Sequence, residues 1–381
     1  MGEWKEYKLG ELGIVVTGKT PKSKNPEDWG DNMFFVTPTD YRKYRKYVDS
    51  SERKLSDIGV KRLENKILPP YSVLVTCIGS DMGKVVISKT PSITNQQINS
   101  IIPNESVDPH FLYYTLINSY NVLRVMGRDG TAVPIVNKRD FENIKIVMPS
   151  LEEQKRIASI LSSLDDKIDL LHQENKTLEA IVETLFRKWF IEEVRQEVLL
   201  GDVVETTSGG TPSRKNEQYY RNGTIDWIKS KELNRSFLLK TEEKITVEAV
   251  ENSSAKFLPA NSVLIAMYGA TVGEYSIIAK EMTCNQAICA LKPNNNYPYT
   301  YLYLWAKFMQ DEFLNLACGA AQQNISQVLI KQQQVCSDVN AVKQFHSIVE
   351  PFFEKLKENE MQLSSLEDMK NVILPKLINN E

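Results

Sequence analysis

The stretch Leu9-Gly10-Glu11-Leu12, followed by Gly18-Lys19-Thr20-Pro21, returns 191 residues later as Leu200-Gly201-Asp202-Val203 and Gly209-Gly210-Thr211-Pro212. The echo continues at an offset of 190, where Leu68-Pro69, Ser72-Val73-Leu74, Gly79, Gly83 and Asn95-Gln96 return as Leu258-Pro259, Ser262-Val263-Leu264, Gly269, Gly273 and Asn285-Gln286. Matching residues that keep a nearly constant offset over most of each half of the chain indicate an internal duplication. The chain of 381 residues therefore contains two similar globular heads.

Each head mixes strand and helix patterns without regular alternation. Apolar runs at 72–78 and 262–268 predict buried strands, and the stretches 13–17 and 202–206 predict two more. Helices are expected at 109–114 and 301–305. This mixture predicts an α+β fold for each head.

Each head is followed by a long helical segment. Ser150 and Glu153 form a capping-box pattern at the start of the first segment. Apolar residues then recur at alternating steps of four and three, which favours a coiled coil over the core stripe of a bundle. The seam residues are Ile157, Leu161, Leu164, Ile168, Leu171, Asn175, Leu178, Val182, Leu185 and Trp189, and then Phe345, Val349, Phe352, Leu356, Asn359, Leu363, Leu366, Lys370, Ile373 and Leu377. Pro375 is expected to kink or end the second helix.

One polar residue in each seam predicts how the helices pair. Antiparallel pairing that places Asn175 opposite Asn359 also brings Ile157 to Leu377 and Trp189 to Phe345. A slip of register would leave a buried amide unpaired. The expected organisation is a first head at 1–148, a helical spacer at 149–197, a second head at 198–338 and a second spacer at 339–381.

Charge and cysteine content limit the class of protein. The formal net charge is −3, and only residues 1–148 are basic, with 21 Lys and Arg against 17 Asp and Glu. Electrostatic binding to nucleic acid must then come from local positively charged patches or from a partner protein. Five cysteines without a CxxC pair, no apolar leader and no membrane-length segment predict a cytoplasmic protein with buried free thiols.

No set of residues predicts catalysis. Residues 13–20 match the phosphate-loop pattern, but Pro21 and Pro26 follow where that loop needs a helix, and the second copy lacks the lysine. Leu68-Pro69-Pro70-Tyr71 lacks the leading polar residue with which amino-methyltransferases hold an amine. The three histidines have no metal-binding spacing. The chain is expected to carry no catalytic residue, metal or cofactor.

Polar side chains in the repeated turns are candidates for contacts to DNA, with solvated loops as the alternative. Asn and Gln can bond adenine edges, and Arg and Lys can bond guanine or phosphate. The candidates in the first head are Lys19, Thr20, Lys22, Lys24, Arg42, Lys43, Asn95, Gln96 and Gln97. Those in the second head are Thr211, Ser213, Arg214, Lys215, Lys229, Lys231, Tyr268, Asn285, Gln286, Gln322, Gln323 and Asn324. The Gly-x-Thr-Pro turn itself either presents a ligand-binding surface or is a plain structural turn.

The order of these motifs resembles the specificity subunits of type I restriction-modification systems. The resemblance rests on the repeated opening and on three later motifs: Pro149-x-Leu151-x-Glu153-Gln154-x-x-Ile157, Leu185-Phe186-Arg187-Lys188-Trp189-Phe190 and Leu374-Pro375-Lys376-Leu377. It covers the whole chain. The second spacer departs from the pattern, because Ser337-Asp338-Val339-Asn340 replaces the first of these motifs.

The resemblance implies two target recognition domains, each reading one half of a bipartite, asymmetric site in double-stranded DNA. The helices would set the gap and dock two modification subunits, which bring S-adenosylmethionine and methylate adenine N6. Restriction subunits would join through that complex and use ATP and Mg²⁺ in defence against foreign DNA. The alternatives are a tandem scaffold that binds proteins through its coiled coil, and an orphan specificity chain or one kept as a recombination donor.

Overall fold

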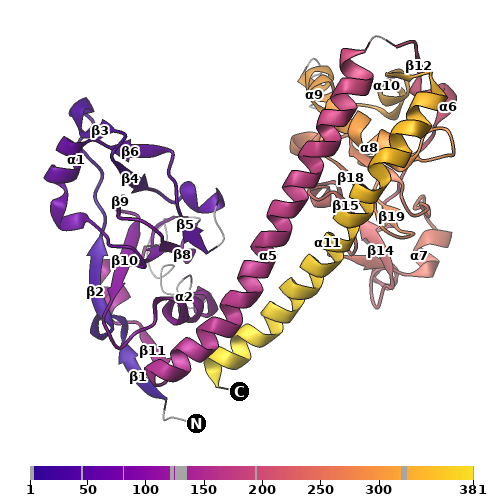
Figure 1. Cartoon of the computed structure of the whole chain (residues 1–381). Helices are drawn as coiled ribbons and strands as arrows, with labels where there is room; N and C mark the ends of the chain where they lie inside the picture. Colours follow the sequence, from indigo (N-terminus) through magenta and orange to yellow (C-terminus); the bar gives the residue numbers. More distant parts are fainter. Residues whose placement is uncertain are drawn as a thin grey trace. The chain divides into compact units, whose positions relative to one another are not determined.

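A computed structural model describes residues 4–43, 46–79, 81–120, 124, 135–193, 195–318 and 324–380, excluding the side chains of Arg42, Lys43 and Cys318 (Figure 1). The chain divides into two compact units: unit 1 comprises Met1–Asp169 and Leu366–Glu381, and unit 2 comprises Leu170–Ser365. This division passes through both long helices. Head 1 (residues 1–148) lies within unit 1 and head 2 (residues 198–338) within unit 2.

The described residues of head 1 form three sheets. Their strand orders are β1-β11, β2-β10-β7-β8-β5 and β3-β6-β4-β9. The strands are β1 Lys5–Lys8, β2 Gly13–Thr17, β3 Trp29–Gly30, β4 Met33–Val36, β5 Tyr47–Val48, β6 Arg53–Leu55, β7 Val73–Thr76, β8 Val85–Ser88, β9 Ser92–Thr94, β10 Ile98–Pro103 and β11 Lys145–Met148. The helices are η1 Leu9–Glu11, η2 Pro26–Asp28, η3 Asp40–Lys43, α1 Asp57–Arg62, η4 Glu64–Lys66, α2 Pro109–Asn118 and α4 Lys138–Glu142.

Head 2 has the sheets β12-β21 and β13-β20-β17-β18-β15, which match those of head 1, and a three-stranded sheet β16-β14-β19 in place of the four-stranded one. The strands are β12 Glu197–Leu199, β13 Glu205–Ser208, β14 Ile225–Ile228, β15 Phe237–Leu238, β16 Lys244–Ile245, β17 Val263–Ala266, β18 Tyr275–Ile278, β19 Thr283–Cys284, β20 Ile288–Lys292 and β21 Gln334–Cys336. The helices are α6 Leu200–Val203, η6 Glu217–Tyr219, η7 Ser230–Glu232, α7 Val247–Glu251, η8 Gly269–Thr271, α8 Tyr299–Phe308, α9 Gln310–Cys318 and α10 Gln327–Lys331.

The two five-stranded sheets share their strand directions as well as their order. In both, the first three pairings are antiparallel and the last, β8 with β5 or β18 with β15, is parallel. The α+β fold and its duplication are thereby confirmed.

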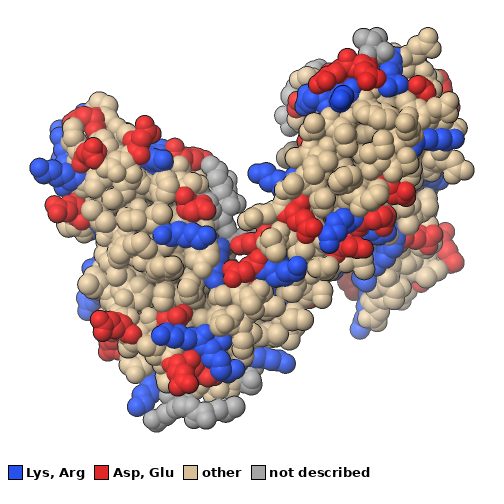
Figure 2. Space-filling view, in the orientation of Figure 1, with Lys and Arg blue, Asp and Glu red and all other residues tan. Residues whose placement is uncertain are grey.

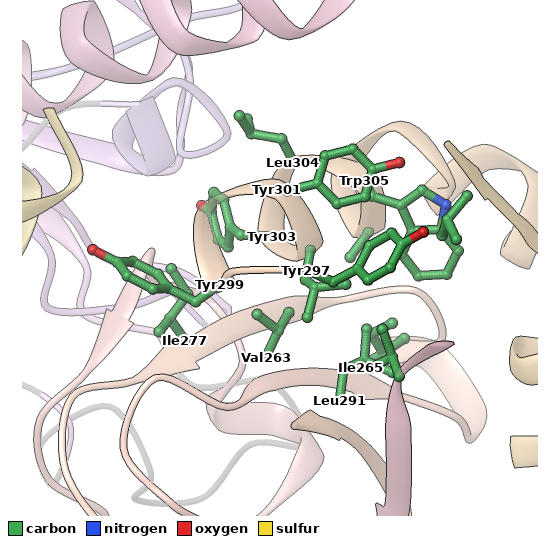
Figure 3. Packing of buried hydrophobic residues seen from close by; sticks show 14 of the residues in the cluster. Val263, Ile265, Ile277, Leu291, Tyr297, Tyr299, Tyr301, Tyr303, Leu304 and Trp305 are labelled. Carbon is green, nitrogen blue, oxygen red and sulfur yellow. The ribbon is translucent and has the colours of Figure 1, made fainter. Parts of the chain in front are cut away.

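One apolar helix covers each of these sheets. Helix α2 contacts β7 and β8, and α8 contacts β17 and β18. Figure 3 shows the aromatic side chains of α8 beside Val263, Ile265, Ile277 and Leu291 of the strands below. Burial of such side chains from water supplies most of the stabilisation of a head.

Two long helices, α5 Leu151–Phe186 and α11 Val339–Asn379, pair antiparallel within each unit (Figure 1). In unit 1, Ile157 and Leu161 of α5 join a cluster with Leu374 and Ile378 of α11. In unit 2, Trp189 lies 6.0 Å from Phe345, ring centre to ring centre, in a π-helical segment, η5 Arg187–Glu192, that follows α5. The predicted coiled-coil pairing is therefore present.

The predicted asparagine contact lies in unit 2. The Asn359 Nδ2 group donates to Asn175 Oδ1 at 2.8 Å, and Asn175 Nδ2 donates to Glu360 Oε1 at 3.1 Å. Glu360 is buried and also pairs with Arg235 at 3.3 Å. Whether this layer fixes the register remains a prediction.

Two predictions about α11 are refined by the structure. Near the end of α11, Leu374 and Ile378 are buried more deeply than the predicted seam residues Ile373 and Leu377. In the same way, Phe353 is buried more deeply than Phe352. The buried face shifts along the helix because an α-helix has 3.6 residues per turn rather than 3.5. Helix α11 also continues past Pro375 to Asn379, and Leu374 and Ile378 on either side of the proline are buried, so Pro375 does not end the helix at its own position. A kink at Pro375 stays a prediction.

Further corrections concern two helix starts. Asp202 and Val203 belong to the short helix α6. The amide of Val204, which follows the helix, donates to the carbonyl of buried Leu200, and strand β13 begins only at Glu205. Ser150 Oγ accepts from the Glu153 amide at 3.4 Å, but the Glu153 carboxylate binds Arg156, so the capping box is only half formed. Among the described residues, no helix is long and apolar enough to cross a bilayer.

Candidate functional site

Two turns meet at one edge of the head 1 sheet. Antiparallel pairing of Thr17 in β2 with Asn99 in β10 brings the end of one strand beside the start of the other. The turn that follows β2 therefore lies against the turn that precedes β10. The Lys19 amide donates to the Thr94 carbonyl at 2.9 Å, and the Thr20 hydroxyl donates to Gln96 Oε1 at 2.6 Å.

Head 2 repeats this arrangement at the equivalent positions. Ser208 in β13 pairs with Cys289 in β20, the Gly210 amide donates to the Cys284 carbonyl at 2.9 Å, and the Thr211 hydroxyl donates to Gln286 Oε1. We call each arrangement a Thr–Gln turn pair, made of Thr20 and Gln96 in head 1 and of Thr211 and Gln286 in head 2.

Glycine is required where the two turns touch. A Cβ atom on Gly18 would lie 2.2 Å from the Asn95 carbonyl oxygen, and one on Gly209 would lie 2.0 Å from the Cys284 carbonyl oxygen. Neither backbone could accept that contact without moving. The repeated glycines thus explain why the two turns can lie so close.

The neighbouring amides have a local structural role. Asn95 is buried, accepts from the Gln97 amide at 3.1 Å and donates to Gln97 Oε1 at 2.9 Å. Asn285 accepts from the Ala287 amide at 3.1 Å in the same way. Such side-chain-to-backbone bonds shape turns. Of the predicted amides in these two turns, Gln96 and Gln286 are the exposed ones.

The predicted cations of head 1 extend into solvent. Lys19, Lys22 and Lys24 are exposed, and no carboxylate of the described residues lies within ion-pair distance of them. The side chains of Arg42 and Lys43 lie outside the described part of the chain. The three lysines leave their full charge available to a polyanion.

The predicted cations of head 2 are mostly paired with acids that the sequence patterns did not single out. Arg214 forms a two-pronged pair with Glu243, Lys229 lies 3.1 Å from the same carboxylate, and Lys231 lies 2.6 Å from Glu242. The hydrogen bond from Arg214 lowers the pKa of Glu243 to about 2. Lys215 and Ser213 remain exposed on the turn.

Aromatic residues brace the turn in head 2. The Trp227 indole donates to the Gly210 carbonyl at 3.0 Å, and the Tyr220 hydroxyl donates to the Pro212 carbonyl at 2.5 Å. The Arg214 guanidinium lies 4.1 Å from the centre of the Tyr220 ring. The sequence contained no signal for this support beyond the aromatic residues themselves.

Tyr268 and Asn324 lie together near the same edge. They form an isolated antiparallel bridge, equivalent to the bridge between Ile78 and Ile135 in head 1. The amide of Met267, next to Tyr268, donates to the Ala287 carbonyl of the Asn285 turn at 2.8 Å. Gln322 and Gln323 lie outside the described residues.

Charge is interspersed rather than concentrated. Figure 2 shows lysine, arginine and acidic side chains side by side over the visible face of each unit. Across the described residues, no group of three or more His, Cys, Asp or Glu side chains has the geometry to hold a metal ion. The edge with its two turns can therefore offer hydrogen bonds and, in head 1, positive charge.

Comparison with known proteins defines the class of this chain. The model of the type I restriction modification DNA specificity domain matches residues 1–180 and again residues 193–336. The chain therefore belongs to the type I restriction-modification DNA specificity family.

Named relatives match over the whole chain. The chain is 27% identical to the type I restriction enzyme MjaIX specificity subunit of Methanocaldococcus jannaschii, over 100% of this chain and 93% of that protein. It is 22% identical to the HindI specificity subunit of Haemophilus influenzae, over 100% of both. The crystal structure of the S subunit from M. genitalium shares the fold, with a TM-score of 0.66 at 15% identity over 99% and 96% of the two chains.

Proposed function

We propose that this chain is the DNA sequence-specificity subunit of a type I restriction-modification complex. The observation that carries the proposal is the Thr–Gln turn pair, which recurs at the equivalent edge of both heads. One recognition element in each head suits a bipartite target whose halves lie in opposite orientation. Because residues around the two turn pairs differ, as Lys19 and Gly210 do, the two half-sites differ in sequence.

Phosphate contacts fall mainly to head 1 and to partner subunits. Lys19, Lys22 and Lys24 are available in head 1, whereas three predicted cations of head 2 pair with the carboxylates of Glu242 and Glu243. Each lysine that neutralises a phosphate releases counterions and makes affinity depend on salt. Replacing these three lysines together weakens binding of all DNA sequences and flattens its salt dependence.

The partners supply the chemistry. Two modification subunits dock on the paired helices and bring S-adenosylmethionine for adenine N6 methylation, and restriction subunits bring ATP and Mg²⁺. This chain contributes recognition and no catalytic group, and the complex works in the cytoplasm. Family membership disfavours a protein-binding scaffold without DNA specificity. An orphan specificity chain would fold normally without a complex.

The test is a methylation map. The chain is co-expressed with the modification subunit of its own system, and methylated adenines are mapped across the host genome. We expect a split motif with two unlike halves that disappears when this chain is omitted. An unchanged map in the presence of an assembled complex would contradict the proposal.

A further inference from the structure

The Thr–Gln turn pair restrains the glutamine carboxamide as well as the shape of the turns. In each pair the threonine hydroxyl donates its proton to the glutamine oxygen Oε1. A glutamine amide has an oxygen that accepts and an NH₂ group that donates. With Oε1 turned toward threonine, the two N–H groups of Nε2 point away from it. This bond restrains the position of the carboxamide, and the orientation in the structure directs Nε2 away from the threonine, although a threonine hydroxyl can also accept from Nε2.

The supports around the pair limit its freedom. The backbone bond from Lys19 to Thr94, or from Gly210 to Cys284, holds the two turns together next to the pair. The glycine contacts keep them close. Gln96 and Gln286 are nevertheless exposed. Each head therefore presents one oriented, solvent-facing carboxamide on a turn anchored to its sheet.

An oriented carboxamide matches one base edge in the major groove. Adenine offers an acceptor at N7 and a donor at N6, which the Nε2 and Oε1 atoms of one glutamine can bind together. Oε1 has two lone pairs, so it can accept from adenine N6 while it accepts from threonine. Guanine offers two acceptors at the same places and fits an arginine or lysine instead.

We infer that Gln96 and Gln286 each read one adenine, Gln96 in the half-site of head 1 and Gln286 in that of head 2, and that Thr20 and Thr211 are their positioning residues. The inference rests on the proposed function. It adds an assignment of one specific base contact to each head and a reason for the repeated threonine.

The experiment compares matched variants in the assembled modification complex. Gln96→Ala should relax the methylated motif at a single position of one half-site, with about a 5- to 100-fold loss of preference for adenine there. Gln286→Ala should relax one position of the other half-site and leave the first unchanged. Thr20→Val removes the hydroxyl at nearly constant shape and should reproduce part of the Gln96→Ala effect. Thr20→Ser keeps the hydroxyl and should restore the preference.

Two controls separate this inference from its alternatives. Thermal unfolding of every variant shows whether a loss of base preference is caused by misfolding. The variants Thr211→Val and Thr211→Ser repeat the threonine test in head 2. A uniform loss of affinity for all sequences would place the amide on the phosphate backbone and overturn base reading. An unchanged motif in folded Gln96→Ala and Gln286→Ala complexes would overturn the inference as well. Failure of the proposed function differs from both, because the unaltered chain would then direct no motif at all.

Discussion

At one equivalent place, unit 1 and unit 2 join their sheets to the long helices with different chemistry. In unit 1 the Tyr114 hydroxyl donates to buried Asp165 at 2.6 Å, Lys370 pairs with the same carboxylate, and buried Lys46 donates to Ser162 at 2.6 Å. In unit 2 the place equivalent to Asp165 is taken by Phe353, eight residues after the matching seam positions Ile157 and Phe345.

The second junction is aromatic. Phe353 packs against Tyr299 and Tyr303 at ring-centre distances of 5.8 and 5.5 Å, and Phe186 contacts four further rings nearby. A polar junction requires every buried charge to be paired, whereas an aromatic junction requires only close packing. The same strand order thus tolerates either solution, and the two units should respond differently to substitution and to pH.

The largest expected effect is at the aromatic junction. Phe353→Ala removes a fully buried ring and leaves a cavity, so it should lower the free energy of unfolding of unit 2 by about 3–5 kcal/mol. Chemical denaturation followed by hydrogen exchange assigns the loss to unit 2. Met361→Ala, at a 57% exposed position of the same helix, is the matched control and should change little. An equal loss in both variants would contradict the packing account.

The polar junction should break in a different way. Asp165→Asn leaves Lys370 without its carboxylate and should cost about 2–3 kcal/mol in unit 1, below the range for a fully buried pair because Lys370 is partly exposed. Removing the second charge as well, with Lys370→Met, should recover part of this loss. A double-mutant cycle measured by denaturation gives the coupling between the two residues. Strict additivity would show that the pair does not stabilise the junction.

A smaller effect is expected at one strained turn. Tyr71 has a positive φ of 65°, and its counterpart in unit 2, Asn261, has a φ of 68°. Asparagine adopts this conformation more easily than tyrosine, so Tyr71→Asn should stabilise unit 1 by about 1 kcal/mol. The reverse change, Asn261→Tyr, should destabilise unit 2. Thermal unfolding measures both, and a lower unfolding temperature for Tyr71→Asn, or a higher one for Asn261→Tyr, would contradict the strain argument.

The smallest effect concerns pH. Burial, and then the nearby Lys46 charge, lower the pKa of His110 below its ordinary value of 6.5. Other groups facing it are Asp108, Asp166 and the Tyr47 hydroxyl, which lies 3.0 Å from Nε2. The unfolded chain therefore binds more protons just below pH 6.5, so stability falls as the pH falls through that region.

An NMR titration of the imidazole checks this directly. The expected result is a His110 pKa below 6.5 and a shallower pH dependence of unfolding in His110→Gln. A midpoint above 6.5, or an equally steep dependence in the variant, would contradict the expected response of the polar junction.

Repetition and periodicity predicted much of this molecule. The internal repeat predicted the two heads. The spacing of apolar residues at steps of four and three predicted the antiparallel helices and the Asn175–Asn359 contact. Local patterns were incomplete where tertiary packing decides, as near Pro375, where the helix continues to Asn379 and Leu374 and Ile378 are buried.

The sequence predicted which residues belong to the site but not which of them contact each other. Thr20 and Gln96 were both candidates, yet 76 positions separate them, and only the pairing of β2 with β10 brings them together. The ion pairs of Glu242 and Glu243 were missed because acids in a loop carry no periodic signal. The buried role of Asn95 was missed because an exposed and a buried amide look alike in sequence.

The most direct test of the account replaces head 2, residues 198–338, with a second copy of head 1 and maps the methylated adenines that the complex produces. If each head reads one half-site and the heads act in opposite orientation, the motif should become symmetric, with the head 1 half followed by its own reverse complement. A motif that remains asymmetric, or that still contains the original second half, would contradict the assignment of one half-site to each head.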